Sequence, residues 1–237
     1  SGLPQVQADC VVIGVHEHGE LSASGKALDR RCGGAIARFL KRGDFPGRLG
    51  ETLLLPAFPR LKASRVLLVG QGATEVSRRS WRKALSAAVG ALAKTRVASA
   101  AVALTRPANR ELDDYTYARS AVEITRAALY RVNDLKSGKK PAEPALQKIK
   151  FGPLPTSAAR SGKRGIAHGL ASANGAKIMR DLANLPGNVC TPTYLAEQAH
   201  ALAERHASLK VKVLEEADIR AEKMGCFLAV TQGSEQP

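Results

Sequence analysis

Aromatic side chains are scarce in this sequence of 237 residues. They make up 4% of the chain, and the only tryptophan is Trp81. Proteins that bind single-stranded nucleic acid by stacking rely on aromatic faces, so the composition argues against that class. Long hydrophobic runs are also missing. The longest, such as residues 66–69 and 100–104, are far shorter than the roughly 20 apolar residues of a membrane-spanning helix. We therefore do not expect this chain to be a membrane protein.

Cysteine is sparse and scattered. Cys10, Cys32, Cys190 and Cys226 form no CxxC pair and no closely spaced group. This pattern favours free thiols in a reducing compartment over a disulfide framework. No basic segment followed by an apolar one opens the chain, as a secretory signal peptide would. We therefore expect a cytoplasmic location.

Positive charge is in excess, and it is unevenly placed. The net charge is +15, but residues 1–164 hold 29 Lys and Arg against 13 Asp and Glu, whereas residues 165–237 hold 7 against 8. One interpretation of the basic part is an anionic partner such as DNA, RNA or an acidic protein. The other is a solvated basic face, which the dispersal of the Lys and Arg residues favours slightly.

Short apolar runs alternate with helical periodicity along the first two-thirds of the chain. The pattern predicts strands at 10–15, 52–55, 65–69, 98–105 and 148–151. It predicts helices at 28–40, broken at Gly33-Gly34, and at 81–94 and 112–132. This alternation is typical of an α/β fold with a largely parallel or mixed sheet. Residues 136–164, rich in Lys, Pro, Ser and Gly, predict a loop around the last strand and a domain edge.

A second α/β run follows. The sequence predicts a helix at 165–184, a helix capped by Thr191 or Thr193, strands at 210–214 and 227–230, and a short helix at 218–224. Two strands and two helices cannot enclose a core of their own. We therefore expect a basic N-terminal α/β domain at 1–164, a linking helix and turn at 165–190, and an incomplete second domain at 191–237.

Phosphate-binding fingerprints are incomplete in this sequence. Gly70-x-Gly72 follows a strand, but Glu75 stands where a dinucleotide-binding loop has its third glycine, so a strand-terminating turn is favoured. Ser137-Gly138-Lys139 and Ser161-Gly162-Lys163 lack the earlier glycine and the following Ser or Thr of a P-loop. The sequence predicts no cofactor-binding residue.

The histidines suggest no metal or catalytic site. His16-x-His18 has no third ligand at a suitable spacing, so we interpret it as a solvated loop. His168 and Asp181 lie along a predicted helix without an identifiable partner, and Asp113-Asp114 is interpreted as the acidic first turn of a helix. From the residues alone, we therefore expect no catalytic residue and no metal-binding residue in this chain.

An ordered set of motifs lies between residues 176 and 237. A helix ends in a pattern formed by Arg180, Leu182, Asn184, Pro186 and Asn188. The later motifs are Thr191-Pro192 with Leu195 and Ala196, then Met224-Gly225, then Gly233-Ser234. In order and spacing this segment resembles the junction region of the leucyl aminopeptidase family, which are cytosolic two-metal exopeptidases.

The resemblance implies a macro-like N-terminal α/β domain, a linking helix and a catalytic α/β domain. It implies a hydrolase, a metalloprotease whose two divalent ions, Mn or Zn, activate water for attack on the first peptide bond of a peptide substrate. It also implies a homo-hexamer, and some bacterial members of the family bind DNA. A macro-type fold also suggests ADP-ribose binding, which the lack of a glycine-rich phosphate loop disfavours.

The metal-binding motifs of the family are a Gly-Lys-Gly stretch and an Asn-Thr-Asp-x-Glu-Gly-Arg run. Neither occurs in residues 1–237. The resemblance therefore assigns no catalytic, metal or cofactor residue in this chain. We expect the chain to be the N-terminal portion of an aminopeptidase and to be inactive alone. The alternative is a basic module for nucleic-acid binding, regulation or assembly.

Overall fold

The computed structural model describes residues 7–58, 60–108, 111–132, 143–152 and 156–234. The chain divides into two compact units, Ser1–Ala176 and Lys177–Pro237. The domain boundaries drawn from the sequence, at residues 164 and 190, stay predictions.

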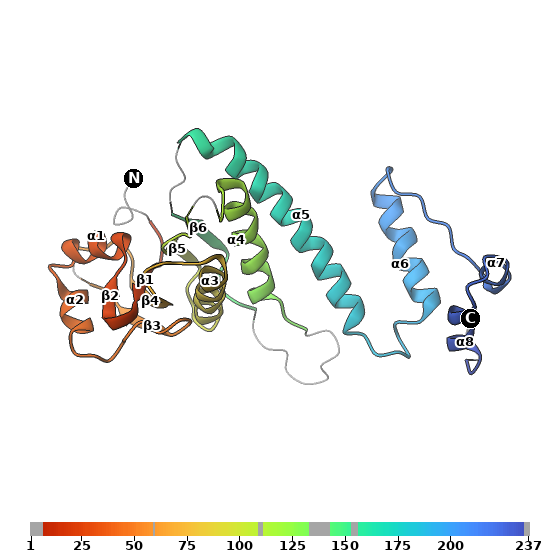
Figure 1. Ribbon diagram of the computed structural model, residues 1–237, viewed down its shortest axis with the longest axis horizontal. Coiled ribbons are helices and arrows are strands. Elements are labelled where there is room, and N and C mark those ends of the chain that lie inside the picture. Colours follow the sequence, from red (N-terminus) through yellow and green to blue (C-terminus); the bar gives the residue numbers. More distant parts are fainter. Residues whose placement is uncertain (1–6, 59, 109–110, 133–142, 153–155, 235–237) are drawn as a thin grey trace. The chain divides into compact units, whose positions relative to one another are not determined.

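A mixed sheet forms the centre of the larger unit (Figure 1). Its strand order is β3-β4-β1-β5-β6, and the short β2 pairs with β1 outside this path. β1, β4, β5 and β6 are parallel, whereas β3 is antiparallel to β4 and β2 to β1. The strands are β1 (Cys10–His16), β2 (Glu20–Leu21), β3 (Thr52–Pro56), β4 (Arg65–Gly72), β5 (Ser99–Ala103) and β6 (Lys148–Phe151).

Helices cover both faces of this sheet. α1 (Ala23–Arg31) and α2 (Ala35–Leu40) pack on one face, and α3 (Arg78–Leu92) and α4 (Asp114–Leu129) pack on the other. Successive side chains of a strand point to opposite faces, so β1 contributes to both cores. This explains why all seven residues of β1 are buried and why its sequence is apolar almost throughout.

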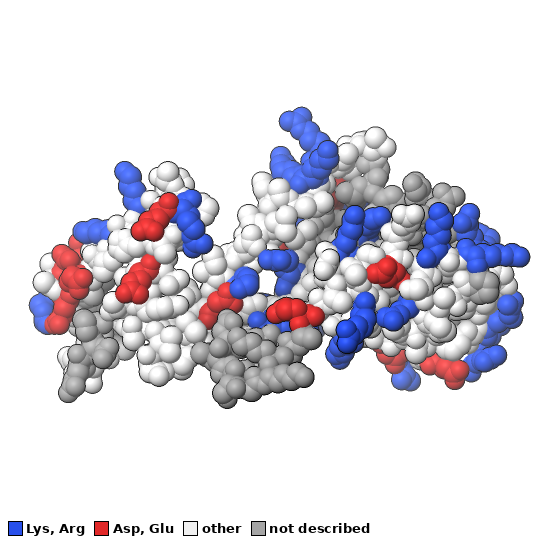
Figure 2. Space-filling view, turned by 180° about the vertical axis from the view of Figure 1, so that it is seen from behind, with Lys and Arg blue, Asp and Glu red and all other residues white. Residues whose placement is uncertain are grey.

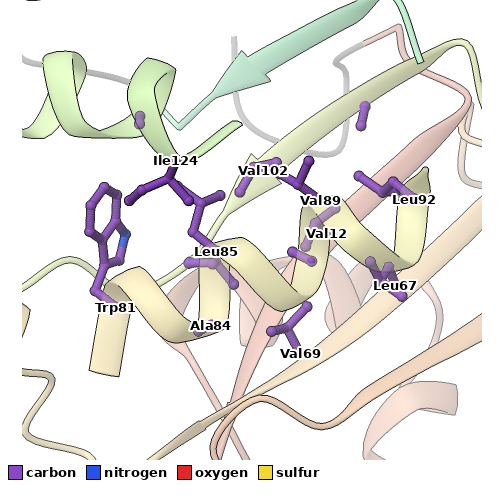
Figure 3. Packing of buried hydrophobic residues seen from close by; sticks show 14 of the residues in the cluster. Val12, Leu67, Val69, Trp81, Ala84, Leu85, Val89, Leu92, Val102 and Ile124 are labelled. Carbon is purple, nitrogen blue, oxygen red and sulfur yellow. The ribbon is translucent and has the colours of Figure 1, made fainter. Parts of the chain in front are cut away.

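The core under α3 and α4 contains the tryptophan. Along α3 the buried side chains recur at helical spacing, as the sequence predicted, and they are Trp81, Ala84, Leu85, Ala88, Val89 and Leu92. Figure 3 shows this stripe facing the strand residues Val12, Leu67, Val69 and Val102. Trp81 also packs on Tyr117 of α4, with ring centroids 5.1 Å apart.

The predicted break in the first helical segment is confirmed. Gly33 and Gly34 both have positive φ, a conformation that glycine adopts without strain, and they separate α1 from α2. The carboxylate of the buried Asp29 then accepts hydrogen bonds from the N–H groups of Ile36 (2.8 Å) and Ala37 (3.1 Å). An aspartate at the end of one helix thus satisfies the first turn of the next.

α5 (Ala159–Ala183) follows the short 3-10 turn η3 (Thr156–Ala158). Its buried residues within the larger unit are small: Gly162, Gly165, Gly169 and Ala173. They allow a close approach to α4, since a Cβ at Gly165 would lie 2.4 Å from the carbonyl oxygen of Tyr115. The helix begins earlier than expected, so the prediction of a loop as far as residue 164 is wrong for residues 159–164.

The smaller unit contains helices α6 (Pro192–Arg205), α7 (Glu216–Ala221) and α8 (Gly225–Thr231). Thr191 is the N-cap of α6, and its hydroxyl accepts a hydrogen bond from the N–H of Tyr194 at 3.2 Å. One of the two alternatives for the cap is therefore confirmed.

The prediction of two strands in this unit is wrong. Residues 210–214 form no regular element, and residues 227–230 lie in α8. Within the described residues of this unit no strand is present that could pair with either segment, and backbone groups without a strand partner must find other bonds. A short apolar run such as 227–230 is ambiguous between strand and helix, and here local helical bonds satisfy its backbone.

Candidate functional site

Ligands of open α/β sheets commonly bind at the carboxyl ends of the parallel strands. At that end of β1 and β4 lie His16 and Gln71, which are 5% and 1% exposed. The carboxamide of Gln71 accepts from the backbone N–H of Thr105 (2.9 Å) and donates to its carbonyl oxygen (3.0 Å). The polar atoms of the Gln71 side chain are therefore satisfied by the main chain.

His16 takes part in the same network. Its Nδ1 lies 3.1 Å from the carbonyl oxygen of Ala73, which can only accept, so this nitrogen carries the hydrogen. Its Nε2 lies 3.2 Å from the hydroxyl of Thr105, which can donate to it. With both ring nitrogens engaged, His16 has no free position for a metal or a substrate.

The interpretation of His16-x-His18 as a solvated loop is wrong for His16, which ends β1 and is buried. His18 is exposed, with a φ of 60°. The two imidazoles therefore lie in different environments. The sequence contained no signal for the contacts of His16, because they reach Ala73 and Thr105 on segments 57 and 89 residues away.

The Asp113-Asp114 pair lies at the start of α4, as predicted. Asp113 is the N-cap, and hydrogen bonds from Thr116, the backbone one 2.7 Å long, hold the pKa of its carboxyl below the usual range. Asp114 accepts from the guanidinium of Arg106 at 2.9 Å, and that guanidinium lies 4.0 Å from the centre of the Tyr117 ring. These contacts stabilise the start of the helix and leave no free acid–base pair.

His168 and Asp181 do have partners, contrary to the expectation from sequence. Nδ1 of His168 lies 2.9 Å from the hydroxyl of Tyr115, and the two rings make an edge-on contact. Asp181 accepts from Nζ of Lys177 at 2.5 Å. The Tyr115 contact joins α5 to α4, so it has a structural explanation.

Metal ligands are not gathered anywhere in the described part of the chain. Residues 7–58, 60–108, 111–132, 143–152 and 156–234 contain no group of three or more His, Cys, Asp or Glu side chains that could hold an ion. The residues present therefore do not fit a two-metal centre. Nor does any helix of these residues combine the length and hydropathy needed to cross a bilayer.

A cluster of cations marks the start of α3. Arg78, Arg79, Arg82 and Lys83 are all exposed, and no ion pair formed by the described residues includes any of them. We name these four residues the α3 basic cluster. Figure 2 shows Lys and Arg spread over one face of the larger unit, with few acidic side chains among them.

This placement is unfavourable for the helix itself. Cations near a helix N-terminus oppose the macrodipole, and like charges at i,i+4, as in Arg78 with Arg82, destabilise a helix by about 0.2–0.5 kcal/mol. The cap, in which the Ser77 hydroxyl accepts from the N–H of Ser80 at 3.1 Å, is uncharged. The cluster is thus a described feature of the larger unit that suits an anionic partner.

Comparison with known protein families identifies both parts of the chain. Residues 12–139 match the N-terminal domain of the cytosol aminopeptidase family, and residues 177–237 match its catalytic domain. The chain belongs to the cytosol aminopeptidase family. The resemblance drawn from the motifs at 180–234 is thereby confirmed.

Curated relatives in this family match along nearly the whole chain. Cytosol aminopeptidase of Pseudomonas aeruginosa is 46% identical over 230 residues, covering 96% of this chain and 46% of the relative. Probable cytosol aminopeptidase of Nitrosococcus oceani is 39% identical over 241 residues, covering 100% of this chain and 48% of the relative. The chain spans about half the length of the curated relatives it matches.

Solved structures of related enzymes have a similar fold. A mutant of tomato leucine aminopeptidase superposes with a TM-score of 0.78 at 25% identity, covering 98% of this chain and 47% of that one. The bottromycin maturation enzyme BotP gives a TM-score of 0.70 at 25% identity, covering 97% of this chain and 44% of that one. BotP has also been solved in complex with Mn. The α/β fold expected from the sequence is thus confirmed as that of the N-terminal half of an aminopeptidase.

The matched motif positions in this family member have structural roles. The side-chain amide of Asn184 donates to the carbonyl oxygen of Arg180 at 2.7 Å and so satisfies a carbonyl near the end of α5. Thr191 caps α6, and Pro192 occupies its first position, where the missing N–H is no loss. Both observations place these motif residues at helix ends.

Proposed function

We propose that this chain is the N-terminal portion of a metal-dependent aminopeptidase that releases N-terminal residues from peptides. The observation that carries the proposal is the paired match to the N-terminal and catalytic domains of one family, in that order. Its relatives are named cytosol aminopeptidases, which supports peptides as substrates and the cytoplasm as the location.

Two divalent ions, Mn or Zn, would supply the chemistry of the complete enzyme by activating a water and polarising the scissile carbonyl. The described residues offer no ligand group for them. At the carboxyl end of the sheet, the side chains of His16 and Gln71 both bond to Thr105, which is a structural role. We therefore propose that the chain alone is inactive. From its membership of the aminopeptidase family we also propose that the complete protein is a homo-hexamer.

Activity of the complete gene product tests this proposal. With Mn²⁺ added, it should hydrolyse leucyl p-nitroanilide, and a chelator such as EDTA should remove the activity. An N-terminally acetylated substrate serves as the control, because an aminopeptidase requires a free amino group. Equal turnover of the acetylated substrate, or full activity after chelation, would contradict the proposal.

DNA binding is a second candidate function, favoured by one specific observation. The α3 basic cluster places four exposed cations over two turns of one helix, without acidic partners among the described residues. Phosphate contacts of this kind supply affinity that does not depend on sequence and that falls steeply with salt. We propose that the larger unit contacts the backbone of double-stranded DNA through this cluster.

Gel-shift titrations of a DNA duplex at two salt concentrations test the second candidate. Replacing the four residues of the α3 basic cluster by alanine should weaken binding and reduce the slope of log K against log salt by about 0.9 for each lost phosphate contact. A matched control removes four exposed cations from the opposite face of the sheet, Arg30, Arg31, Lys41 and Arg42. No retardation at low salt, or equal losses in both variants, would refute a site at α3.

A further inference from the structure

The outer edge of β3 is open. β3 lies at the end of the strand order, and no strand of the described residues pairs with its far side. The N–H of Gly70 donates to the carbonyl oxygen of Glu51 at 2.9 Å. Hydrogen-bonded pairs alternate along an antiparallel ladder, so residues 53 and 55 also bond to β4. The N–H and C=O groups of Thr52 and Leu54 therefore point away from β4.

A groove runs beside this edge. It has a volume of about 470 Å³ and lies between β3 and the second half of α3. Its lining is mostly apolar and small, and includes Thr52, Leu54, Leu67, Ala87, Gly90 and Ala91. Leu54 is 39% exposed, and a Cβ at Gly90 would meet no atom within 4 Å. Figure 3 shows how the sheet residue Leu67 and the α3 residue Leu92 lie at this end of the helix.

The two ends of the groove are basic. The side chain of Lys83 lies over Gly50, where its Cε would be 3.2 Å from an added Cβ. Lys94, which lines the groove, lies just past the end of α3 at Leu92, and the helix between Lys83 and Leu92 is about 14 Å long at a rise of 1.5 Å per residue. The lining includes no acidic residue, and the nearby Glu51 forms an ion pair with Arg48.

We propose that the open edge of β3 and this groove bind an extended segment of an acidic polypeptide. The segment adds a strand to β3 through the outward backbone groups of Thr52 and Leu54. Alternate side chains then face α3, so a central aliphatic side chain fills the groove, and acidic side chains two positions before and after it reach Lys83 and Lys94. Such a pair is about 13 Å apart in a strand, which suits the spacing of the lysines.

Charge decides between this occupant and a second copy of the chain. Pairing two β3 edges would bring together the lysines of two grooves, on domains that each carry an excess of 16 positive charges over residues 1–164. Like charges facing one another across an interface oppose association. An acidic segment gains from the same charges. Pro56 ends the open edge because it has no N–H, so the added strand is short.

Fluorescence anisotropy with labelled peptides tests the proposal on the whole chain. The probe is a fluorescein-labelled Glu-Ser-Leu-Ser-Glu peptide with blocked ends, and the control peptide has lysine in place of both glutamates. We expect saturable binding of the acidic peptide alone, weakened by salt. Equal binding of both peptides, or no binding of either, would overturn the proposal.

Two matched pairs of variants locate the site. Thr52→Pro removes one outward N–H while Thr52→Val keeps it, and we expect about tenfold weaker binding for the proline variant, the size of one well-formed hydrogen bond. Gly90→Leu fills the groove, whereas Gly175→Leu makes the same change in α5, where a Cβ also meets no atom within 4 Å. Gly90→Leu should abolish binding and Gly175→Leu should not, with thermal melts confirming that both are folded.

Sedimentation velocity completes the test. Without peptide, we expect the chain and its Gly90→Leu variant to have the same oligomeric state. If a dimer forms and Gly90→Leu dissociates it, the occupant is a second copy and the proposed acidic segment is wrong. If neither Thr52→Pro nor Gly90→Leu changes peptide affinity, the peptide binds elsewhere and the proposal is equally overturned.

Discussion

The side chain of Gln71 crosses β1 to reach the main chain of Thr105, where it forms two hydrogen bonds of 2.9 and 3.0 Å. It can cross because Gly14 has no side chain: a Cβ there would lie 1.8 Å from Oε1 of Gln71. One carboxamide thus joins β4 to the segment after β5, over the strand between them. The bridge therefore links three neighbouring parts of the sheet at its carboxyl end.

Removing this bridge should destabilise the larger unit. Gln71→Leu leaves the N–H and C=O of the part-buried Thr105 without this partner. At about 1 kcal/mol for each group, the lower end of the range for unsatisfied groups because Thr105 is not fully buried, we expect a loss of about 2 kcal/mol. Gln7→Leu, at an exposed position, is the control. Urea denaturation followed by circular dichroism measures both. A loss below about 0.5 kcal/mol for Gln71→Leu would show that the bridge does not contribute.

Gly14→Ala should act through the same contact. The new methyl group displaces the carboxamide of Gln71, so both substitutions remove the same interaction. Their effects on the free energy of unfolding should therefore not be additive. In a double-mutant cycle, Gln71→Leu should destabilise the Gly14→Ala variant much less than it destabilises the original chain. Additive free energies of unfolding would mean that Gly14 and Gln71 act independently.

Thr125 offers a stabilising substitution. Its hydroxyl is the buried side-chain oxygen without a hydrogen-bond partner among the described residues. Replacing it by a methyl group removes an unsatisfied group at constant shape, so Thr125→Val should stabilise the unit by up to about 1 kcal/mol. Thr95→Val is the matched control: its hydroxyl donates to the carbonyl oxygen of Leu92 at 2.7 Å, and losing that bond should destabilise. Urea denaturation distinguishes the two signs, and a destabilised Thr125→Val would contradict the assignment.

The N-cap of α4 should make stability depend on pH. Hydrogen bonds from Thr116 lower the pKa of Asp113 in the folded state. Its contribution is therefore present above the usual pKa of an aspartate and is lost as pH falls through the lowered value. Asp113→Asn keeps a capping oxygen without titrating, so it should lose less stability than the original chain between pH 6 and pH 3. Asp113→Ala should lose about 1 kcal/mol already at pH 6.

Urea denaturation at the two pH values measures these differences. The original chain also contains Asp9, whose pKa is lowered chiefly by a backbone hydrogen bond from Ser99, so Asp113→Asn should retain part of the pH dependence. The same loss between pH 6 and pH 3 in the original chain and in Asp113→Asn would contradict the role assigned to Asp113.

Thiol reactivity should separate the cysteines. Burial raises the pKa of Cys10 to about 11, whereas Cys226 is exposed. Because the thiolate is the reactive form, Cys226 should react rapidly with a disulfide reagent at pH 7.5, and Cys10 only when the protein unfolds. Cys226→Ala should remove the fast phase of labelling, measured by absorbance. A fast phase that persists in this variant and disappears in Cys10→Ala would contradict the burial of Cys10.

Local patterns predicted most of the larger unit. Buried strands such as β1, the stripe of α3 and the break at Gly33-Gly34 depend on neighbours in sequence, and the structure confirms each. The segments at 210–214 and 227–230 show the limit, because a strand also requires a partner that the pattern does not contain. The contact between Gln71 and Thr105 could not be predicted either, since it joins residues 34 positions apart.

The family was found from motif order at 180–234, not from any reactive group. Arg180, Asn184 and Thr191 have helix-end roles, so their chemistry alone would suggest no enzyme. The α3 basic cluster was visible as charge but not as a site, since its exposure and the absence of acidic partners among the described residues depend on the fold.

Hydrolysis by the purified 237-residue chain tests the central claim most directly. We propose that the chain is the N-terminal portion of an aminopeptidase and is inactive alone, and its described residues hold no group of three or more metal ligands. With leucyl p-nitroanilide and added Mn²⁺ or Zn²⁺, the chain should release p-nitroaniline no faster than buffer containing the same metal. Release that depends on the metal, scales with chain concentration and disappears with EDTA would contradict the claim.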